Sequence, residues 1–145
     1  MTLHLIKLCV GVSEIPELAR WQRERVATQK KKGIKKPVLR HLTRNTPKRA
    51  EEILDGGSLY WVIKGVVRVR QRIIGIGPAP DAGEEPRCEL RLDRRLVRVV
   101  PRPCRAFQGW RYLEPADAPP DLDANDPMAK MPPRMIEELR SLGLL

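Results

Sequence analysis

The hydrophobic pattern at the start of the chain predicts a strand followed by a helix. Apolar side chains recur across residues 3–12 at strand-like spacing. Pro16 suits a first helical turn, and the helix it begins has a partly apolar face and ends before Gly33. Lysines in its last turn complement the negative end of the helix dipole. Residues 34–45 have a short apolar stretch and no clear period, and we interpret them as a loop.

The next segment predicts a second, shorter helix. Thr46 is a candidate N-cap, and Pro47 is suited to the first helical position. The pattern carries this helix to about Asp55, where Gly56 and Gly57 end it.

Strand patterns dominate the rest of the first 113 residues. Residues 59–64 are β-branched and aromatic, and Gly65 marks the turn into a long strand over residues 66–76. Residues 88–92 and 96–100 form a further strand pair. The prolines that follow at Pro101 and Pro103 indicate an edge strand or a crossing strand.

These elements predict an α+β fold. Its centre is a small, strongly curved mixed sheet or pseudo-barrel, with two to three flanking helices. The division we predict is a basic α+β domain over 1–113, a proline-rich, acidic, extended segment over 114–133, and a short amphipathic helix over 134–145. A length of 145 residues is enough for one independent core.

Charge adds a partner class to this picture. Residues 1–113 hold 25 basic and 11 acidic side chains, whereas residues 114–145 hold 3 and 7, so a basic body precedes an acidic tail. Between Lys30 and Arg49 there are nine basic residues and no acidic one. Like charges held close together repel, and a nucleic acid would supply the missing counter-charge. The alternative is that the net charge of +10 only keeps the protein soluble.

The candidate phosphate-binding residues combine cations with hydroxyl and amide donors. A second row of arginines lies on one face of the strand over 66–76, where it either extends the cationic surface or pairs with acids of the C-terminal segment. The full candidate set is Lys30, Lys31, Lys32, Lys35, Lys36, Arg40, Arg44, Asn45, Thr46, Lys48, Arg49, Arg68, Arg70 and Arg72.

A base pocket is the second candidate feature. Tyr60 and Trp61 are consecutive in a strand, so they point to opposite faces of the sheet. One of them belongs to the core; the other, with Trp110 and Arg111, is a candidate wall against which an unstacked base lies flat. For each aromatic residue the alternative is a place in the core.

Motifs for catalysis are absent from the sequence. It has no nucleotide-binding glycine loop, no nucleophile elbow and no zinc-protease motif. His4 and His41 are the only histidines, and the three cysteines are far apart, so we expect no metal, no cofactor and no disulfide. Free thiols, the lack of a signal-peptide pattern and the lack of a long apolar window favour the cytoplasm, without a membrane partner.

Three blocks of the sequence resemble a conserved alphaproteobacterial family with a domain of unknown function. They are Leu3–Gly11, Thr46–Gly65 and Ala106–Leu113. Together they spread this resemblance over nearly the whole chain.

A more local resemblance covers residues 43–76. Arg44-Asn45, Arg49, Gly56 and the strand Leu59–Val62 follow in an order that is similar to the PUA-like superfamily, especially its EVE and ASCH branches. The resemblance implies a small pseudo-barrel that binds RNA or a modified base in a pocket beside the helix. By position, the residues near such a pocket are Arg44, Asn45, Arg49, Tyr60 and Trp61.

The sequence therefore predicts a non-catalytic protein that binds ribosomal or transfer RNA, with RNA favoured over DNA. Two alternatives remain open. One is an RNA-modifying or nucleotide-processing enzyme with a PUA-like pocket. The other is a protein-interaction module that acts through the acidic tail and the terminal helix.

Overall fold

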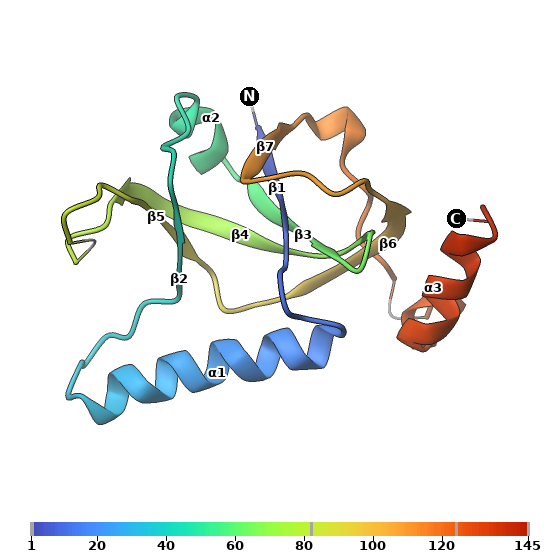
Figure 1. The fold of residues 1–145 in the computed structure, drawn as a ribbon, viewed down its shortest axis with the longest axis horizontal. Helices are drawn as coiled ribbons and strands as arrows, with labels where there is room; N and C mark the ends of the chain where they lie inside the picture. The colour runs from blue at the N-terminus through green and yellow to red at the C-terminus, as the bar shows by residue number, and fades with distance from the viewer. Residues whose placement is uncertain (1, 82, 124, 145) are drawn as a thin grey trace.

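A strongly curled mixed sheet forms the centre of the molecule in the computed structural model, which describes residues 2–81, 83–123 and 125–144 (Figure 1). The sheet has seven strands in the order β2-β5-β4-β3-β1-β7, and β6 also pairs with β4. The strands are β1 (His4–Leu8), β2 (Arg40–Thr43), β3 (Ser58–Ile63), β4 (Val66–Pro78), β5 (Cys88–Leu92), β6 (Val97–Pro103) and β7 (Trp110–Leu113). The helices are α1 (Ile15–Lys31), α2 (Ala50–Leu54) and α3 (Pro133–Ser141), with short 3₁₀ turns at Pro115–Asp117 and Pro127–Lys130.

The curl of the sheet follows from the length of β4. One edge of this strand pairs with β3, and the other pairs first with β6 and then with β5. The pairing shifts at bulges between Trp61 and Val62 and between Ile73 and Gly75, and such bulges increase local twist. β1 runs parallel to β3, whereas the other pairs are antiparallel.

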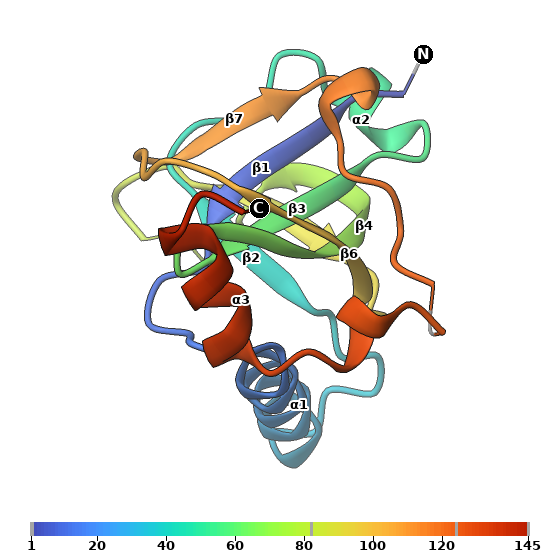
Figure 2. The ribbon, with the colours of Figure 1, turned by 90° about the vertical axis from the view of Figure 1, so that its right-hand side faces the viewer.

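Two apolar clusters lie on the two faces of this sheet. The larger one faces α1, which lies along one side of the curled sheet (Figures 1 and 2). It contains Leu5, Leu59 and Trp61 from the sheet and Ile15 and Leu18 from the helix. The smaller cluster includes Ile6, Tyr60, Val62, Val67, Val99 and Leu113 on the opposite face.

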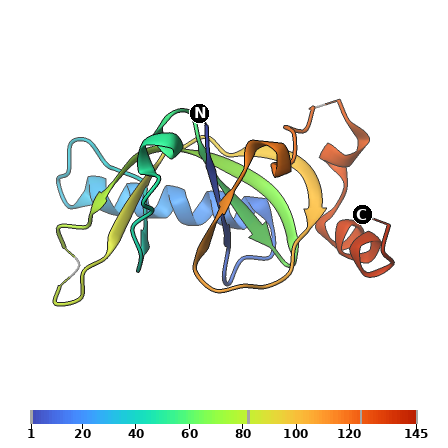
Figure 3. The same ribbon diagram turned by 90° about the horizontal axis from the view of Figure 1, so that it is seen from above.

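The C-terminal segment wraps around β6 before it forms α3, as the view in Figure 3 shows. Val99 pairs with Asp121 in an isolated bridge, and the Val100 amide donates to the Pro120 carbonyl at 2.9 Å. α3 then buries Ile136, which is 2% exposed. No described helix is both long and apolar enough to cross a membrane.

The predicted α+β class with a strongly curved mixed sheet and two to three helices is confirmed, and the structure has three helices. Several predicted element boundaries were wrong. The first strand ends at Leu8 rather than at residue 12, and the last helix ends at Ser141. The interpretation of residues 34–45 as a loop missed β2, whose pairing with the distant β5 makes Arg40–Thr43 a strand.

Another wrong boundary is the start of α2, which begins at Ala50 instead of Pro47. Pro47 is buried, and residues 48–49 form a turn. The Arg49 amide there donates to the Tyr112 hydroxyl at 3.2 Å. A tertiary contact therefore satisfies a backbone donor that the predicted N-cap would have served.

Candidate nucleic-acid interface and a neighbouring cavity

Five lysines of the basic run gather at the C-terminal end of α1. Gly33, with φ +86°, lets the chain reverse there, and the side-chain amide of Gln29 holds the returning chain through two hydrogen bonds to the Val38 backbone, at 2.8 and 2.9 Å. All five lysines are exposed, and none has an ion pair within the described part of the chain. We call this set the lysine cluster: Lys30, Lys31, Lys32, Lys35 and Lys36.

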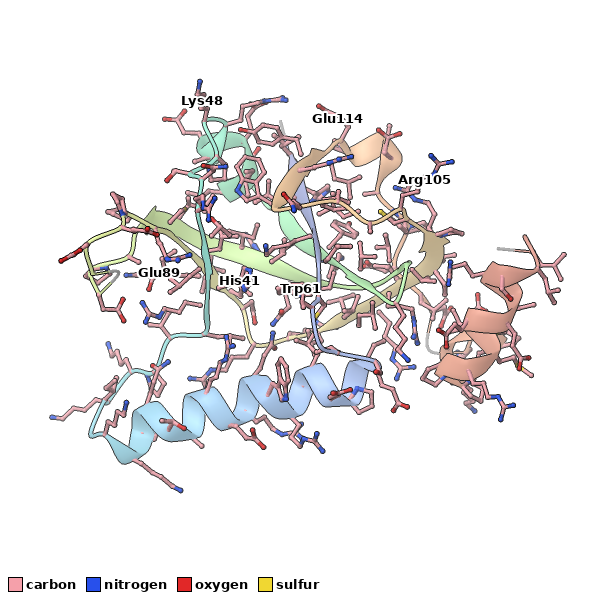
Figure 4. The ribbon with its side chains drawn as sticks, viewed as in Figure 1. His41, Lys48, Trp61, Glu89, Arg105 and Glu114 are labelled. Atoms are coloured by element: carbon pink, nitrogen blue, oxygen red, sulfur yellow. The ribbon has the colours of Figure 1, made fainter. Side chains whose placement is uncertain are left out.

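A second group of candidates lies at the opposite end of β2, beside α2. Arg44, Asn45, Thr46, Lys48 and Arg49 are all exposed there. Figure 1 shows that the C-terminal end of α1 and the end of β2 beside α2 are on opposite sides of the molecule. Lys48, which is labelled in Figure 4, lies at the end beside α2. The basic run of the sequence is thus divided into two surfaces.

Two arginines of the run are already paired with carboxylates. Arg40 pairs with Asp81 and, at 3.1 Å, with Glu89, and these contacts raise the pKa of its guanidinium. Arg49 pairs with Glu52 at 2.6 Å and with Glu114 at 3.4 Å. These two side chains therefore carry less unbalanced charge than the lysine cluster.

The three arginines of β4 do not form an exposed row. Arg68 is 8% exposed, and burial lowers the pKa of its guanidinium. Arg70 pairs with Asp121 through two hydrogen bonds of 2.7 and 2.8 Å. Of these three arginines, Arg72 alone is exposed. At Arg70 the structure matches the alternative in which acids of the C-terminal segment pair with the row.

The candidate base-pocket residues are divided between the two faces of the sheet. Tyr60 and Trp61 are each 4% exposed and belong to different apolar clusters. Trp61 and Trp110 pair in register with Lys7 from its two sides, so these three side chains share a face. Arg111, next to Trp110 in its strand, lies on the other face, with its guanidinium over the Phe107 ring at 4.7 Å.

Trp61 instead lines a cavity of about 230 Å³ between β1, β2 and α1. His41 of β2 meets the Trp61 ring edge to face, with 5.1 Å between ring centroids, and Figure 4 shows both labelled side chains between the two strands. We call this space the β1–β2 cavity. Its lining consists of Lys7, Leu8, Cys9, Val10, Leu18, Trp21, Gln22, Arg25, Leu39, Arg40, His41, Trp61 and Leu92.

A buried glutamine, Gln71, fixes one wall of the β1–β2 cavity. Gln71 is 0% exposed, and its amide oxygen accepts bonds from Trp61 Nε1 at 2.9 Å and from Gln22 Nε2 at 2.8 Å. Its amide nitrogen donates to Gln22 Oε1 at 2.8 Å and to the Asp93 carbonyl at 3.0 Å. The network joins the sheet to α1 and holds the Trp61 ring in place.

The field inside this cavity is positive. Lys7 and Arg25, which have no ion pair among the described residues, line it together with Arg40, whose charge Asp81 and Glu89 offset, and no carboxylate is among its lining residues. Burial, followed by the charges of Lys7 and Arg25, lowers the pKa of His41 to about 4. Burial also lowers the pKa of Lys7, and burial followed by the charge of Glu17 raises the pKa of the Cys9 thiol to about 11.

Neither Lys7 nor Arg25 was predicted from the sequence to be a site residue, and His41 was predicted to lie in a loop. Lys7 is one polar residue in an apolar strand, and its neighbours in space come from distant segments. The signal that could have found it is the interruption of the first strand by a lysine on its core-facing side.

The described residues contain no candidate metal site, because no group of three or more histidine, cysteine or carboxylate side chains is placed to hold an ion. Cys9, Cys88 and Cys104 are free thiols.

The chain matches a known protein family. A family model with the description "Protein of unknown function (DUF1489)" matches residues 5–145. No curated protein matches the chain, and no solved structure matches it either.

Proposed function

Because the chain belongs to this family of proteins of unknown function, its activity has to be inferred from its own residues, and we propose that it binds RNA without catalysing a reaction. The observation that carries the proposal is the lysine cluster, whose five exposed ammonium groups have no carboxylate partner in the described structure. Like charges at this density repel one another, and the phosphates of a polyanion relieve that repulsion.

A groove beside the lysine cluster supports the same proposal. It has a volume of about 420 Å³ and lies between α1 and the segment that connects β5 to β6. Arg23, Lys30 and Arg94 line it, with no carboxylate among the lining residues. Arg94 also donates to the Pro37 carbonyl at 3.2 Å, which fixes this segment against the loop that carries Lys35 and Lys36. Phosphates on the lysine cluster would thus meet further cations along α1.

The second basic surface, at Arg44 and Lys48, gives the proposed RNA a separate contact at the far end of β2. A folded RNA, such as ribosomal or transfer RNA, can reach both ends of β2 more readily than a short single strand can. We also propose a PUA-like relationship, which the curled sheet supports. We propose a cytoplasmic location as well, and the free thiols are the feature that supports it.

Salt dependence is the direct test of this proposal. Binding of fluorescently labelled transfer RNA or ribosomal RNA fragments is measured by anisotropy from 50 to 300 mM KCl. We expect log K to fall linearly with log salt, by about 0.7 to 0.9 for each phosphate neutralised. Affinity that does not change over this range would contradict the proposal.

Matched charge variants locate the surface. The triple variant Lys30→Gln, Lys31→Gln and Lys32→Gln should bind at least 10-fold more weakly with a smaller salt slope. The control triple Lys64→Gln, Arg105→Gln and Arg134→Gln removes the same charge at exposed positions away from the lysine cluster. An equal loss in both triples would show that only net charge matters and would reject the lysine cluster as the site.

Protein binding is a second candidate function, favoured by exposed apolar side chains near the C-terminus. Met135 is 51% exposed and Leu142 is 70% exposed. Isotope-edited crosslinking in cells, compared between the wild type and the variant Met135→Ser, Leu142→Ser, tests it. Loss of a defined crosslinked protein in the variant supports this function, and an unchanged crosslink pattern rejects it.

A further inference from the structure

We propose that the β1–β2 cavity binds a small organic anion, with the carboxylate or phosphate group held by Lys7, Arg25 and His41 and the apolar body lying between Trp21 and Trp61. This site is separate from the lysine cluster, and the inference does not depend on the proposed RNA binding.

The first argument is the unbalanced charge. Lys7 is partly buried and lies between Trp61 and Trp110 in the strand register, and within the described residues its ammonium group has no ion pair. Taking an ammonium group out of water without a counter-charge is unfavourable. The guanidinium of Arg25, which is exposed and also without such a pair, adds to the same field. An anion in the cavity supplies the counter-charge that the described residues lack.

The second argument is an unsatisfied polar atom. His41 Nε2 is the one fully buried side-chain nitrogen or oxygen in the described residues that has no hydrogen-bond partner. Buried polar atoms in native proteins almost always have a partner, so such an atom needs an explanation. In the neutral imidazole, Nε2 can carry the proton and donate it to an anion, and a protonated ring would donate more strongly.

The groups that face His41 come from three elements. Lys7 approaches from β1 and Arg25 from α1, while Arg40, its neighbour in β2, is paired with Asp81 and Glu89. A wider hollow outside the cavity shares Trp21, Arg25 and His41 with it and includes Glu24. Glu24 therefore lines the wider hollow and not the β1–β2 cavity, so the cavity keeps its positive field.

The third argument is the size and lining of the cavity. A volume of about 230 Å³ is that of about eight water molecules, each of which takes about 30 Å³ in the liquid. This is too small for a polynucleotide and suits a compact molecule. Leu18, Leu39 and Leu92 line it together with Trp61, whose ring the Gln71 network holds in place, so the apolar part of a ligand meets a rigid wall.

The shared chemistry of the ligand is thus an anionic group on a compact apolar or planar body. We would titrate the full-length protein with benzoate, uridine 5′-monophosphate and inorganic phosphate at constant ionic strength, with chloride as the reference. The readout is the imidazole NMR signal of His41, which His4→Asn distinguishes from the other histidine of the chain. Benzoate represents a free carboxylate ligand, the nucleotide a phosphorylated planar one, and phosphate the charge alone.

We expect saturable binding of benzoate or the nucleotide at least 10-fold tighter than that of inorganic phosphate, with a shift of the His41 signal and a rise in its pKa. Preference between the two organic probes identifies the source of the anion. No saturable binding of either organic probe at millimolar concentration would overturn the proposal. Binding without a His41 shift, or no tighter than that of phosphate, would overturn it as well.

Paired variants test the two cations. Lys7→Met and Arg25→Gln should each weaken binding at least 10-fold, whereas Lys130→Met and Arg20→Gln, which alter exposed cations outside the cavity, should not. Lys7→Met should also fold at least as stably as the wild type, because it removes a partly buried charge; a purely structural lysine would give the opposite result. The variant with Lys30, Lys31 and Lys32 changed to Gln should retain anion binding, so failure of this site and failure of RNA binding are distinguishable.

Discussion

At the residue scale, Gln71 shows how one buried amide organises the interior. Its four hydrogen bonds reach Trp61, the Gln22 side chain and the Asp93 carbonyl, which belong to three separate segments. Each such bond contributes about 1 kcal/mol net, and each buried group left without a partner costs about 1–3 kcal/mol. The position of Trp61 in the β1–β2 cavity therefore depends on a residue that does not line the cavity.

Gln71→Leu should lower the free energy of unfolding by about 3 kcal/mol, because it leaves Trp61 Nε1 and the Gln22 amide without their partner. Urea denaturation followed by tryptophan fluorescence measures the loss. Gln108→Leu is the control, since Gln108 is exposed and its replacement should change stability by less than about 0.5 kcal/mol. Equal stability of both variants would contradict the structural role of the network.

The pH dependence of stability also belongs to single residues. The pKa of His41 is about 4 in the folded protein and returns to about 6.5 on unfolding. Between these values the unfolded chain binds more protons, so stability is complete above pH 6.5 and falls as the pH drops towards 4. His41→Phe keeps a ring against Trp61 and removes this titration.

Between pH 7 and pH 4 we expect the variant His41→Phe to lose about 1–3 kcal/mol less stability than the wild type. This range discounts the pKa shift of His41 for the partial exposure of its side chain. Urea titrations at a series of pH values measure the difference. A smaller slope should persist in the variant, because burial lowers the pKa of His4 as well. Parallel curves for the two proteins would show that His41 is not the buried titrating group.

At the element scale, Gly57 is where α2 passes into β3. A Cβ atom added there would lie 2.1 Å from the Leu3 carbonyl oxygen and 2.4 Å from that of Ile53, and both are backbone atoms that cannot turn aside. Gly57→Ala should therefore destabilise the protein by about 3 kcal/mol or more. Thermal unfolding measures the change. Gly77→Ala is the matched control, because its Cβ would meet nothing within 4 Å; a similar loss there would reject the steric explanation.

Elements with a strong local pattern were predictable, and elements set by distant contacts were not. The turn at Lys64-Gly65, where both residues have positive φ, was visible as a glycine between two apolar runs. β2 has no such pattern, since three of its four residues are Arg40, His41 and Thr43. It is a strand because Leu42 and His41 pair with Glu89 and Leu90, far along the chain.

One candidate site could likewise be predicted from the sequence, and the other could not. Exposure of the lysine cluster was predictable, because consecutive charges have no core position to occupy. The β1–β2 cavity was not, because Lys7, Arg25 and His41 are brought together by the curl of the sheet and by the position of α1. The pairing of Arg70 with Asp121 likewise depends on the path of the C-terminal segment around β6.

At the scale of the whole molecule, the acidic C-terminal segment pairs with part of the basic body. Asp121 pairs with Arg70, and Glu114 lies 3.4 Å from Arg49. Both arginines were predicted to contact RNA, and both now have a carboxylate within the same chain. The lysine cluster has no such partner in the described structure, so its positive charge at the C-terminal end of α1 is not offset by the C-terminal segment.

The C-terminal helix should be able to detach without unfolding the sheet. Ile136 is the buried residue of α3, and it lines a pocket together with Ile63, Val66 and Arg68. An isolated helix of nine residues is only marginally stable in water, because helices shorter than about 12–15 residues do not offset the cost of nucleation. Docking of α3 therefore depends mainly on Ile136, with a further contact where the Arg140 guanidinium lies against Gly65, rather than on the stability of the helix itself.

Ile136→Ala should accordingly weaken docking by about 2–4 kcal/mol while the rest of the fold remains intact. Hydrogen exchange followed by mass spectrometry should show the amides of α3 exchanging at least 10-fold faster, with unchanged protection in β3 and β4. Met135→Ala, at a residue that is 51% exposed, should leave exchange in α3 as it is. If both variants behave alike, or if β3 and β4 lose protection together with α3, the helix is an integral part of the cooperative fold and not a separately docked segment.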